Sequence, residues 1–288
     1  MTSTLTLQQK SIQYRQTILT MIKRSRTGHT GGSLSCVDIL NVLYNQVMNI
    51  SPENFANPHR DHYIHSKGHS VEALYTVLAD RGFFPSERLE TFSRYQSHLI
   101  GHPTRKVPGI EQNTGALGHG LSVAVGLALA AKKDGRPGRV FTLLGDGELA
   151  EGSSWEASLS ATHYKLDNLV VIVDRNGLQI TGQTETVMQL EGLADKFTAF
   201  GYAVKRINGN DVADLVQTFD ELPFKPGKPN LVLAQTVKGC GISFMENQAK
   251  WHHKVPNDDE FAQAMAELDA AKTKLIKSSE MENTEVLQ

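Results

Sequence analysis

Short apolar runs and amphipathic stretches alternate along most of the 288-residue chain. Two runs, RVFTLL at 139–144 and NLVVIV at 168–173, are almost continuously apolar, which is typical of parallel strands covered on both faces. Weaker strand patterns lie at 61–64, 202–207 and 230–236. Because helical patterns separate these runs, we predict a doubly wound α/β fold with a mostly parallel sheet and helices on both faces.

The segments between the strands carry apolar residues at helical spacing. This spacing predicts helices over 5–23, 35–48, 71–81, 120–133, 153–164, 193–200 and 212–219. We expect Ser153 or Ser154 to cap its helix, and 28–32 and most of 95–115 to be loops. The helix from Gly120 is rich in Ala and Gly, so we expect it to be buried in the fold or to form a subunit contact.

Composition narrows the class of protein. The formal net charge is -2 and no long basic run occurs, which argues against nucleic acid as the main partner. The sequence contains no run of about 18 apolar residues, so we expect no membrane span. The N-terminus lacks the apolar core of a signal peptide. Cys36 and Cys240 lie far apart and are expected to be free thiols in a reducing cytoplasm. We expect one domain over 1–270, followed by a polar and flexible tail over 271–288.

Polar residues follow the two strongest strand patterns at the point where each pattern ends. Asp146 follows the first, in LGDGELAEG, and Asn176 follows the second, in DRNGLQITG. The carboxyl ends of parallel strands form one ligand-binding edge, and carboxylate and amide oxygens suit Mg²⁺ or Ca²⁺. A GDG sequence alone is more often a plain turn. The second motif thirty residues later favours a ligand site, where Gly145 and Gly147 let the backbone approach phosphate oxygens.

The run GDGELAEGSSWEASLSATHYKLDNLVVIVDRNGLQITG resembles the thiamine diphosphate motif, which begins with GDG and ends in an Asn-containing turn. The neighbouring motifs resemble those of transketolases in particular. They are TGHTGGSLSCVDIL at 27–40, HSKGHSVEALY at 65–75, GHP at 101–103, NTGALGHGLSVAVGLALA at 113–130 and KGCGISFMENQAKWHHKVPND at 238–258. The resemblance covers about residues 10 to 260 and implies the thiamine diphosphate-binding fold of the diphosphate-binding domain.

The resemblance also implies roles for single residues. Asp146, Asn176 and the carbonyl of Leu178 would hold Mg²⁺, or Ca²⁺ or Mn²⁺ in its place. Gly147 and His69 would contact the diphosphate, and Asn176 would belong to the cofactor site as well as to the metal site.

Further cofactor contacts are implied for the backbone of Gly115 and Leu117. In that segment this chain departs from the family's Gly-Pro-Leu-Gly-Gln-Gly by having Ala116 and His119.

Four of the eleven histidines lie in family motifs. Besides His69, these are His29, His102 and His252, which would face the sugar and move protons, work that suits an imidazole. His252 is preferred over its neighbour His253 because of the family's His–Gly pattern, although both remain candidates. The remaining histidines are expected to be structural or to lie on the surface; they include His59, His62, His65, His98 and His163.

Two acids, Glu151 and Glu156, follow the GDG motif. A solvated acidic face is one interpretation of them. In similar thiamine enzymes the matching acids lie at a subunit interface and link two active sites, where paired acids would titrate together. The resemblance therefore counts them among the catalytic residues.

The implied function is that of the N-terminal subunit of a split transketolase. With a second subunit that carries the pyrimidine-binding and C-terminal domains, in an α₂β₂ assembly, it would transfer a two-carbon ketol unit from a ketose phosphate to an aldose phosphate. Two alternatives remain: the α subunit of a 2-oxo acid dehydrogenase, and a regulatory homologue without activity. The histidines in TGHTGG, SKGH and IGHP argue against the first, and the intact motifs argue against the second.

Overall fold

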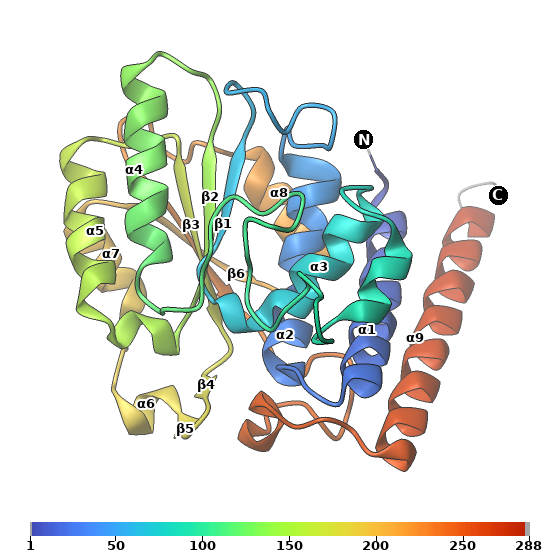
Figure 1. Cartoon of the computed structure of the whole chain (residues 1–288). Coiled ribbons are helices and arrows are strands. Elements are labelled where there is room, and N and C mark those ends of the chain that lie inside the picture. Colours follow the sequence, from blue (N-terminus) through green and yellow to red (C-terminus); the bar gives the residue numbers. More distant parts are fainter. Residues whose placement is uncertain (1, 286–288) are drawn as a thin grey trace.

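The computed structural model describes residues 2–285, and a five-stranded parallel sheet forms its centre (Figure 1). The strands are β1 (His62–His65), β2 (Val140–Gly145), β3 (Leu169–Arg175), β6 (Ala203–Asn208) and β7 (Asn230–Gln235). Their order across the sheet is β1-β2-β3-β7-β6, and every neighbouring pair is parallel. The predicted α/β fold with a parallel sheet is therefore confirmed.

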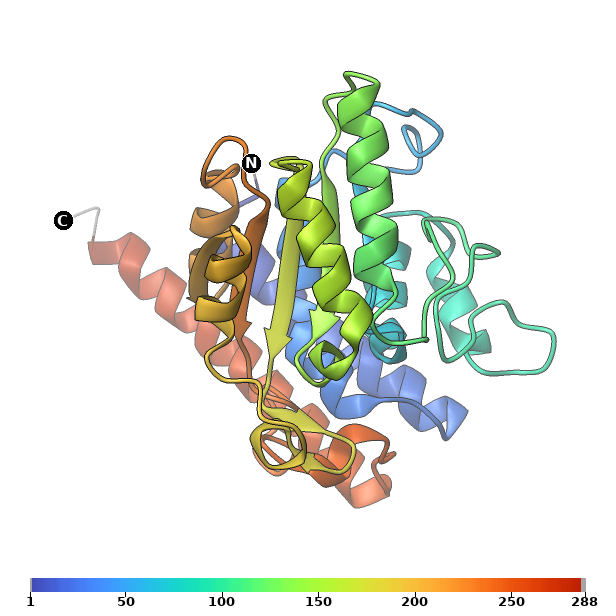
Figure 2. The ribbon, with the colours of Figure 1, turned by 90° about the vertical axis from the view of Figure 1, so that its left-hand side faces the viewer.

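Helices cover both faces of this sheet (Figures 1 and 2). One face is covered by α4 (Gly120–Lys133), α5 (Gly152–His163) and α7 (Leu193–Phe200). The other side holds α1 (Thr4–Ser25), α2 (Thr30–Val42), α3 (Val71–Asp80) and α8 (Val212–Asp220). Alternate residues of each strand point to opposite faces, so β2 contributes Phe141 and Leu143 to one core and Val140 and Leu144 to the other.

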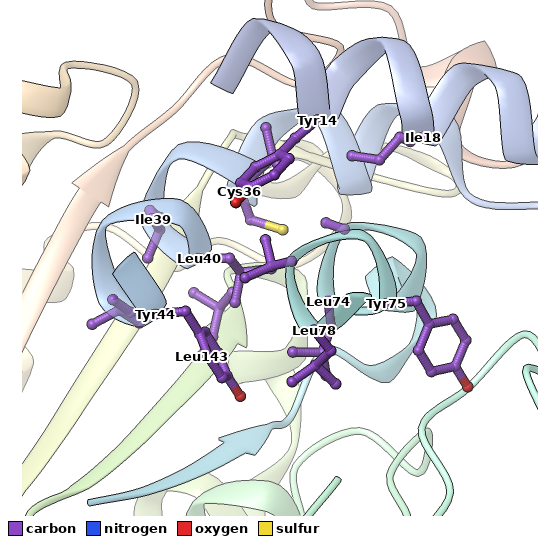
Figure 3. Close-up of a cluster of buried hydrophobic side chains, with 14 of the residues drawn as sticks. Tyr14, Ile18, Cys36, Ile39, Leu40, Tyr44, Leu74, Tyr75, Leu78 and Leu143 are labelled. Atoms are coloured by element: carbon purple, nitrogen blue, oxygen red, sulfur yellow. The ribbon is translucent and has the colours of Figure 1, made fainter. Parts of the chain in front are cut away.

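Helix α2 lies at the centre of the larger core. All of its residues are buried, as expected for a helix with neighbours on every side. Figure 3 shows Leu40 of α2 among Tyr14 of α1, Leu78 of α3 and Leu143 of β2. Burial of each such side chain stabilises the fold by roughly 1.5–3 kcal/mol. Cys36 lies in the same cluster, and both it and Cys240 are free thiols, as expected.

Two predicted helix starts differ from the structure. Helix α2 begins at Thr30, so Gly31 and Gly32 are helical instead of forming a loop. Glycine is a poor helix former, but a Cβ at Gly31 would lie 3.0 Å from the Lys238 side chain and 3.1 Å from the carbonyl oxygen of Trp251, so the close packing favours glycine there. Helix α5 has Glu151 at its N-cap and no side-chain cap; Ser153 instead donates to the carbonyl of Gly118 at 2.9 Å.

The segment from 258 to 285 forms one long helix. Helix α9 (Asp258–Glu285) runs through the expected boundary at 270/271, and its buried Ala264 and Leu268 join the core beside α1. Burial of these apolar residues anchors the helix, and its polar second half continues the same hydrogen-bonded ladder. Residues 286–288 of the expected tail lie outside the described residues.

Shorter elements complete the fold. The sequence pattern did not predict the hairpin of β4 (Leu178–Gln179) and β5 (Gly182–Gln183) or α6 (Thr184–Val187), which lie beyond the carboxyl ends of the strands (Figure 1). A π-helical turn, η1 (Leu43–Val47), extends α2. Short 3-10 helices are η2 (Gly68–Ser70), η3 (Ser86–Thr91), η4 (Gly147–Ala150) and η5 (Ala249–His252). Within residues 2–285, no helix has the length and apolar character needed to cross a membrane.

Candidate active site

A cavity of about 280 Å³ opens at the carboxyl ends of the strands, where parallel sheets bind their ligands. Most of the expected site residues line it: His69, His102, His252, Gly115, Leu117, Asp146, Gly147, Asn176 and Leu178. Glu148, Lys67 and Lys238, to which the sequence pattern gave no role, line it as well. The cavity thus gathers segments from five separate motifs.

Asp146 lies at the start of the turn after β2 and is held by its neighbours. Its Oδ1 accepts from the backbone N–H of Gly147 at 2.8 Å. Its Oδ2 accepts from the N–H of Gly177 at 2.7 Å and from Arg175 at 3.0 Å. Burial, together with the nearby Asp174 carboxylate, raises the pKa of Asp146. A carboxylate has about four acceptor positions, so Oδ1 keeps one that can face a cation.

Asn176 is oriented by Asp174. The Nδ2 of Asn176 donates to the Asp174 carboxylate at 3.2 Å. Because an ionised carboxylate can only accept, this contact directs the amide oxygen of Asn176 to the other side, where it accepts from the N–H of Leu178 at 3.1 Å. A carbonyl oxygen has two lone pairs, so one remains. Asp146, Asn176 and the carbonyl of Leu178 each present a hard oxygen donor, the type of ligand that Mg²⁺ prefers.

Two lysines bring positive charge into the cavity, and each side chain is about 1% exposed. Burial alone would lower the pKa of Lys67, but its close ion pair with Asp174 outweighs burial and raises it. Lys238 donates to the carbonyl of Leu178 at 3.1 Å and to Nδ1 of His252 at 2.9 Å. Burial, followed by the charge of Lys67, lowers the pKa of Lys238 to about 8. An anionic ligand would offset this cost of burying positive charge.

The histidines of four motifs form one cluster around His29. Its ring centroid lies 5.3 Å from that of His69, 6.0 Å from His102, 5.7 Å from His252 and 4.6 Å from His253. Burial lowers the pKa of His29 to about 4 and that of His252 to about 3. Both rings are therefore neutral near pH 7 and can donate as well as accept. The buried Nδ1 of His29 has no hydrogen-bond partner within residues 2–285, and His29, unlike His69, His102 and His252, is not among the residues that line the cavity.

His252 and His253 occupy different positions. His252 lines the cavity and stacks on His69 with ring centroids 5.2 Å apart, whereas His253 is exposed and contacts His29 from outside the lining. The geometry favours His252 as the cavity residue. His119 is also exposed, and its Nδ1 donates to the carbonyl of Leu117 at 3.0 Å.

Glu151 and Glu156 do not reach the cavity. Both are exposed on the surface of α5 and its N-cap. The folding of this chain alone does not bring them beside the histidines.

The sequence pattern did not identify Lys67, Lys238 and Glu148, because no periodic pattern along the chain marks a charged residue that becomes buried. The available signal was that Lys67 and Lys238 lie inside motifs, in SKGH and KGCG. A lysine directly before a glycine, as at Lys67 and Lys238, suggests a side chain directed into a loop-lined site.

Known proteins resemble this chain over almost its whole length. Residues 8–283 match the family described as "Transketolase, thiamine diphosphate binding domain". An apulose-4-phosphate transketolase subunit of Phocaeicola vulgatus is 46% identical over 274 residues, which is 95% of this chain and 98% of that protein. A protein of the same name from Actinobacillus succinogenes is 48% identical, covering 91% of this chain and 95% of that protein.

Solved transketolases share the fold. The enzyme of Campylobacter jejuni matches with a TM-score of 0.85 and 30% identity, covering 96% of this chain but 46% of that one. The Pichia stipitis enzyme in complex with sedoheptulose 7-phosphate matches with a TM-score of 0.83 and 26% identity, covering 98% of this chain and 46% of that one. This chain thus spans a little under half the length of the solved enzymes. By the match over residues 8–283 and by these relatives, the chain belongs to the transketolase family and corresponds to its thiamine diphosphate-binding domain.

Proposed function

We propose that this chain is the cofactor-binding subunit of a split transketolase, which transfers a two-carbon ketol unit from a ketose phosphate to an aldose phosphate. The observation that carries the proposal is the composition of one cavity. Hard oxygen donors, two buried lysines and a cluster of neutral histidines lie together at the carboxyl edge of the sheet. These groups suit a metal-bound diphosphate next to a polyhydroxylated substrate.

We infer that Asp146, Asn176 and the carbonyl of Leu178 hold a divalent cation, with Mg²⁺ favoured and Ca²⁺ or Mn²⁺ able to replace it. Each oxygen has a free acceptor position, although the ammonium of Lys238 occupies one position on the Leu178 carbonyl. His69, Gly147 and Lys238 would hold the diphosphate. Its negative charges would stabilise the buried lysines, and the glycine leaves room for its oxygens.

Bound thiamine diphosphate supplies a nucleophilic carbon and an electron sink for breaking the bond next to a ketone. The chain's own histidines would bind and orient the sugar. His29, His102 and His252 can each donate to or accept from a hydroxyl, because burial lowers their pKa values and leaves the rings neutral. A neutral imidazole can accept the proton of a sugar hydroxyl as the adjacent carbon–carbon bond breaks.

A second chain is part of the proposal. Two relatives of almost the same length are named as subunits of a transketolase, and the solved transketolases are about twice as long. We infer that a separate chain carries the pyrimidine-binding and C-terminal domains and forms an α₂β₂ assembly with this one. Glu151, Glu156 and the outer face of α4 are exposed, and they are the surfaces we assign to subunit contacts.

Reconstitution tests the proposal. The chain is co-expressed with a transketolase C-terminal half from the same genome, purified by size exclusion, and assayed with ketose phosphates, including apulose 4-phosphate and common pentulose phosphates. We expect ketol transfer from the complex and none from either half. Full activity of the purified 288-residue chain would rule out the split enzyme, and turnover of 2-oxo acids instead of ketoses would favour the dehydrogenase alternative. Cofactor binding without any turnover in the complex would indicate a regulatory homologue.

A further inference from the structure

Glu148 joins three of the loops that form the cavity. Its carboxylate is about 2% exposed. Oε1 accepts from the backbone N–H of Gly118 at 2.9 Å and, closely, from the hydroxyl of Ser66, while Oε2 accepts from the N–H of Gly145 at 3.0 Å. These donors belong to the segment after β1, the segment before α4 and the end of β2. A single side chain therefore connects segments that are far apart in the sequence.

Only a carboxylate satisfies all of these donors. Its two oxygens accept on both sides, whereas an amide accepts on one side and donates on the other. If Gln replaced Glu148, its NH₂ group would face either the N–H of Gly118 or that of Gly145. One buried backbone donor would then lose its acceptor in either orientation, and buried backbone donors in native proteins are almost always paired.

The glycines at these contacts show how closely the loops approach. Gly118 has a φ of +81°, and a Cβ there would lie 2.5 Å from the Cβ of Glu151. A Cβ at Gly120 would lie 2.2 Å from the Ser66 hydroxyl. A side chain at either position would push these segments apart, and Glu148 accepts from the backbone of Gly118 at this close approach.

We propose that Glu148 is a positioning residue that holds segment 115–118 against the 145–147 turn, so that the cavity is formed before thiamine diphosphate binds. This inference rests on the proposed function, because it assigns the preformed cavity to that cofactor. Glu148 itself acts through the backbone of the two segments. Its loss should therefore weaken cofactor binding more than it slows the saturated enzyme.

The test compares Glu148→Gln with the unchanged chain in two measurements. Titration calorimetry with thiamine diphosphate and Mg²⁺ should show about tenfold weaker binding, as expected for one unpaired buried donor. Hydrogen exchange of the cofactor-free chain should be faster in peptides that cover 113–120 or 143–147 and unchanged in β3 and β7. In the reconstituted enzyme, kcat at saturating cofactor should be nearly unchanged.

Glu246→Gln is the matched control. Glu246 also accepts from a backbone N–H, that of Gly241 at 2.9 Å, but it lies outside the cavity lining, so neither measurement should change. If Glu148→Gln does not fold, Ser66→Ala replaces it in the test, because that variant removes only one of the three donors. Ser66→Ala should weaken cofactor binding by about threefold. Unchanged affinity and exchange in Glu148→Gln, or in Ser66→Ala where that variant is used, would overturn the inference. A failure of the unchanged chain to bind the cofactor would instead contradict the proposed function.

Discussion

At the scale of single residues, the site depends on charges that are buried but paired. Arg175 shows this clearly, because its guanidinium binds Asp146 and also Glu185 and Glu191, at 2.6 and 2.8 Å. Lys67 is paired with Asp174 in the same way. These ion pairs offset part of the desolvation cost of burying the Asp146 carboxylate beside the cavity.

Asp146→Ala should abolish metal-dependent cofactor binding while the fold is kept. The substitution removes the carboxylate that we propose as a metal ligand, whereas Arg175 retains Glu185 and Glu191 as partners. We expect thiamine diphosphate affinity in the presence of Mg²⁺ to fall roughly 100-fold or more, measured by calorimetry. Asp195→Ala, an exposed aspartate of α7, is the control. Unchanged affinity in Asp146→Ala would remove this residue from the metal site.

His29→Ala and His102→Ala should lower turnover far more than cofactor affinity. Both rings belong to the neutral cluster, and loss of acid–base catalysis typically costs about 10²–10⁴ in rate. His69→Ala should show the opposite pattern, with weaker cofactor binding first. Steady-state kinetics of the reconstituted enzyme separates a loss of turnover from a loss of cofactor affinity. His98→Ala, at an exposed position, is the control. Normal rates in the first two variants would make those residues structural.

At the scale of elements, helix α2 positions His29 through its N-terminus. The Oε1 of Glu72, on α3, accepts from the backbone N–H of His29 at 2.9 Å, and its Oε2 accepts from the hydroxyl of Ser33 at 2.8 Å. Glu72 is fully buried, and burial raises its pKa to about 7. Two helices and a catalytic candidate are therefore linked by one titratable group.

This link predicts a pH dependence of stability. The folded chain binds a proton at Glu72 up to about pH 7, while the unfolded chain loses it near 4.5, so the free energy of unfolding should fall as pH rises between these values. Glu72→Gln keeps the shape without the charge. The free energy of unfolding of this variant, relative to that of the unchanged chain, should increase between about pH 4.5 and about pH 8. The increase should be on the order of 3 kcal/mol.

Urea unfolding at several pH values measures the effect of Glu72→Gln. Exposed Glu87→Gln is the control, because solvent already surrounds that carboxylate. A stability difference between Glu72→Gln and the unchanged chain that does not vary with pH would contradict the assignment.

At the scale of the whole molecule, helix α4 exposes a row of small residues on its outer face. Ser122, Gly126 and Ala130 are exposed there at a spacing of four residues, while Ala124 and Ala128 pack inward. Small residues allow another backbone to approach, and that is why we assign this face to a subunit contact.

Gly126→Glu should prevent assembly without harming the fold. A Cβ at Gly126 meets no atom within 4 Å, and replacing a helical glycine stabilises the helix by about 0.5–1 kcal/mol. The melting temperature of the isolated chain should be unchanged or higher, while analytical ultracentrifugation with the partner should show the assembly lost. Ala270→Glu, exposed on α9, is the control. Normal assembly of Gly126→Glu would place the contact elsewhere.

The sequence predicts the strands and most helices because their apolar periodicity is strong. It also predicts that Asp146 and Asn176 approach each other, since both follow covered strands. It does not predict the helical start at Thr30, because glycine propensity points the other way and packing against Lys238 overrides it. Lys67 and Glu148 were missed for a related reason, since their partners come from distant segments that no local pattern connects.

The pairing of α1 with distant segments has a consequence during biosynthesis. Arg15 of α1 donates to the carbonyl of Cys240, 225 residues away, at 2.9 Å, and Leu268 of α9 completes the apolar packing beside the same helix. At roughly 5–20 residues per second, a ribosome needs on the order of 10–45 s to add those 225 residues. We expect the apolar face of α1 to lack part of its cover throughout that interval, until the segment from 240 to 268 emerges.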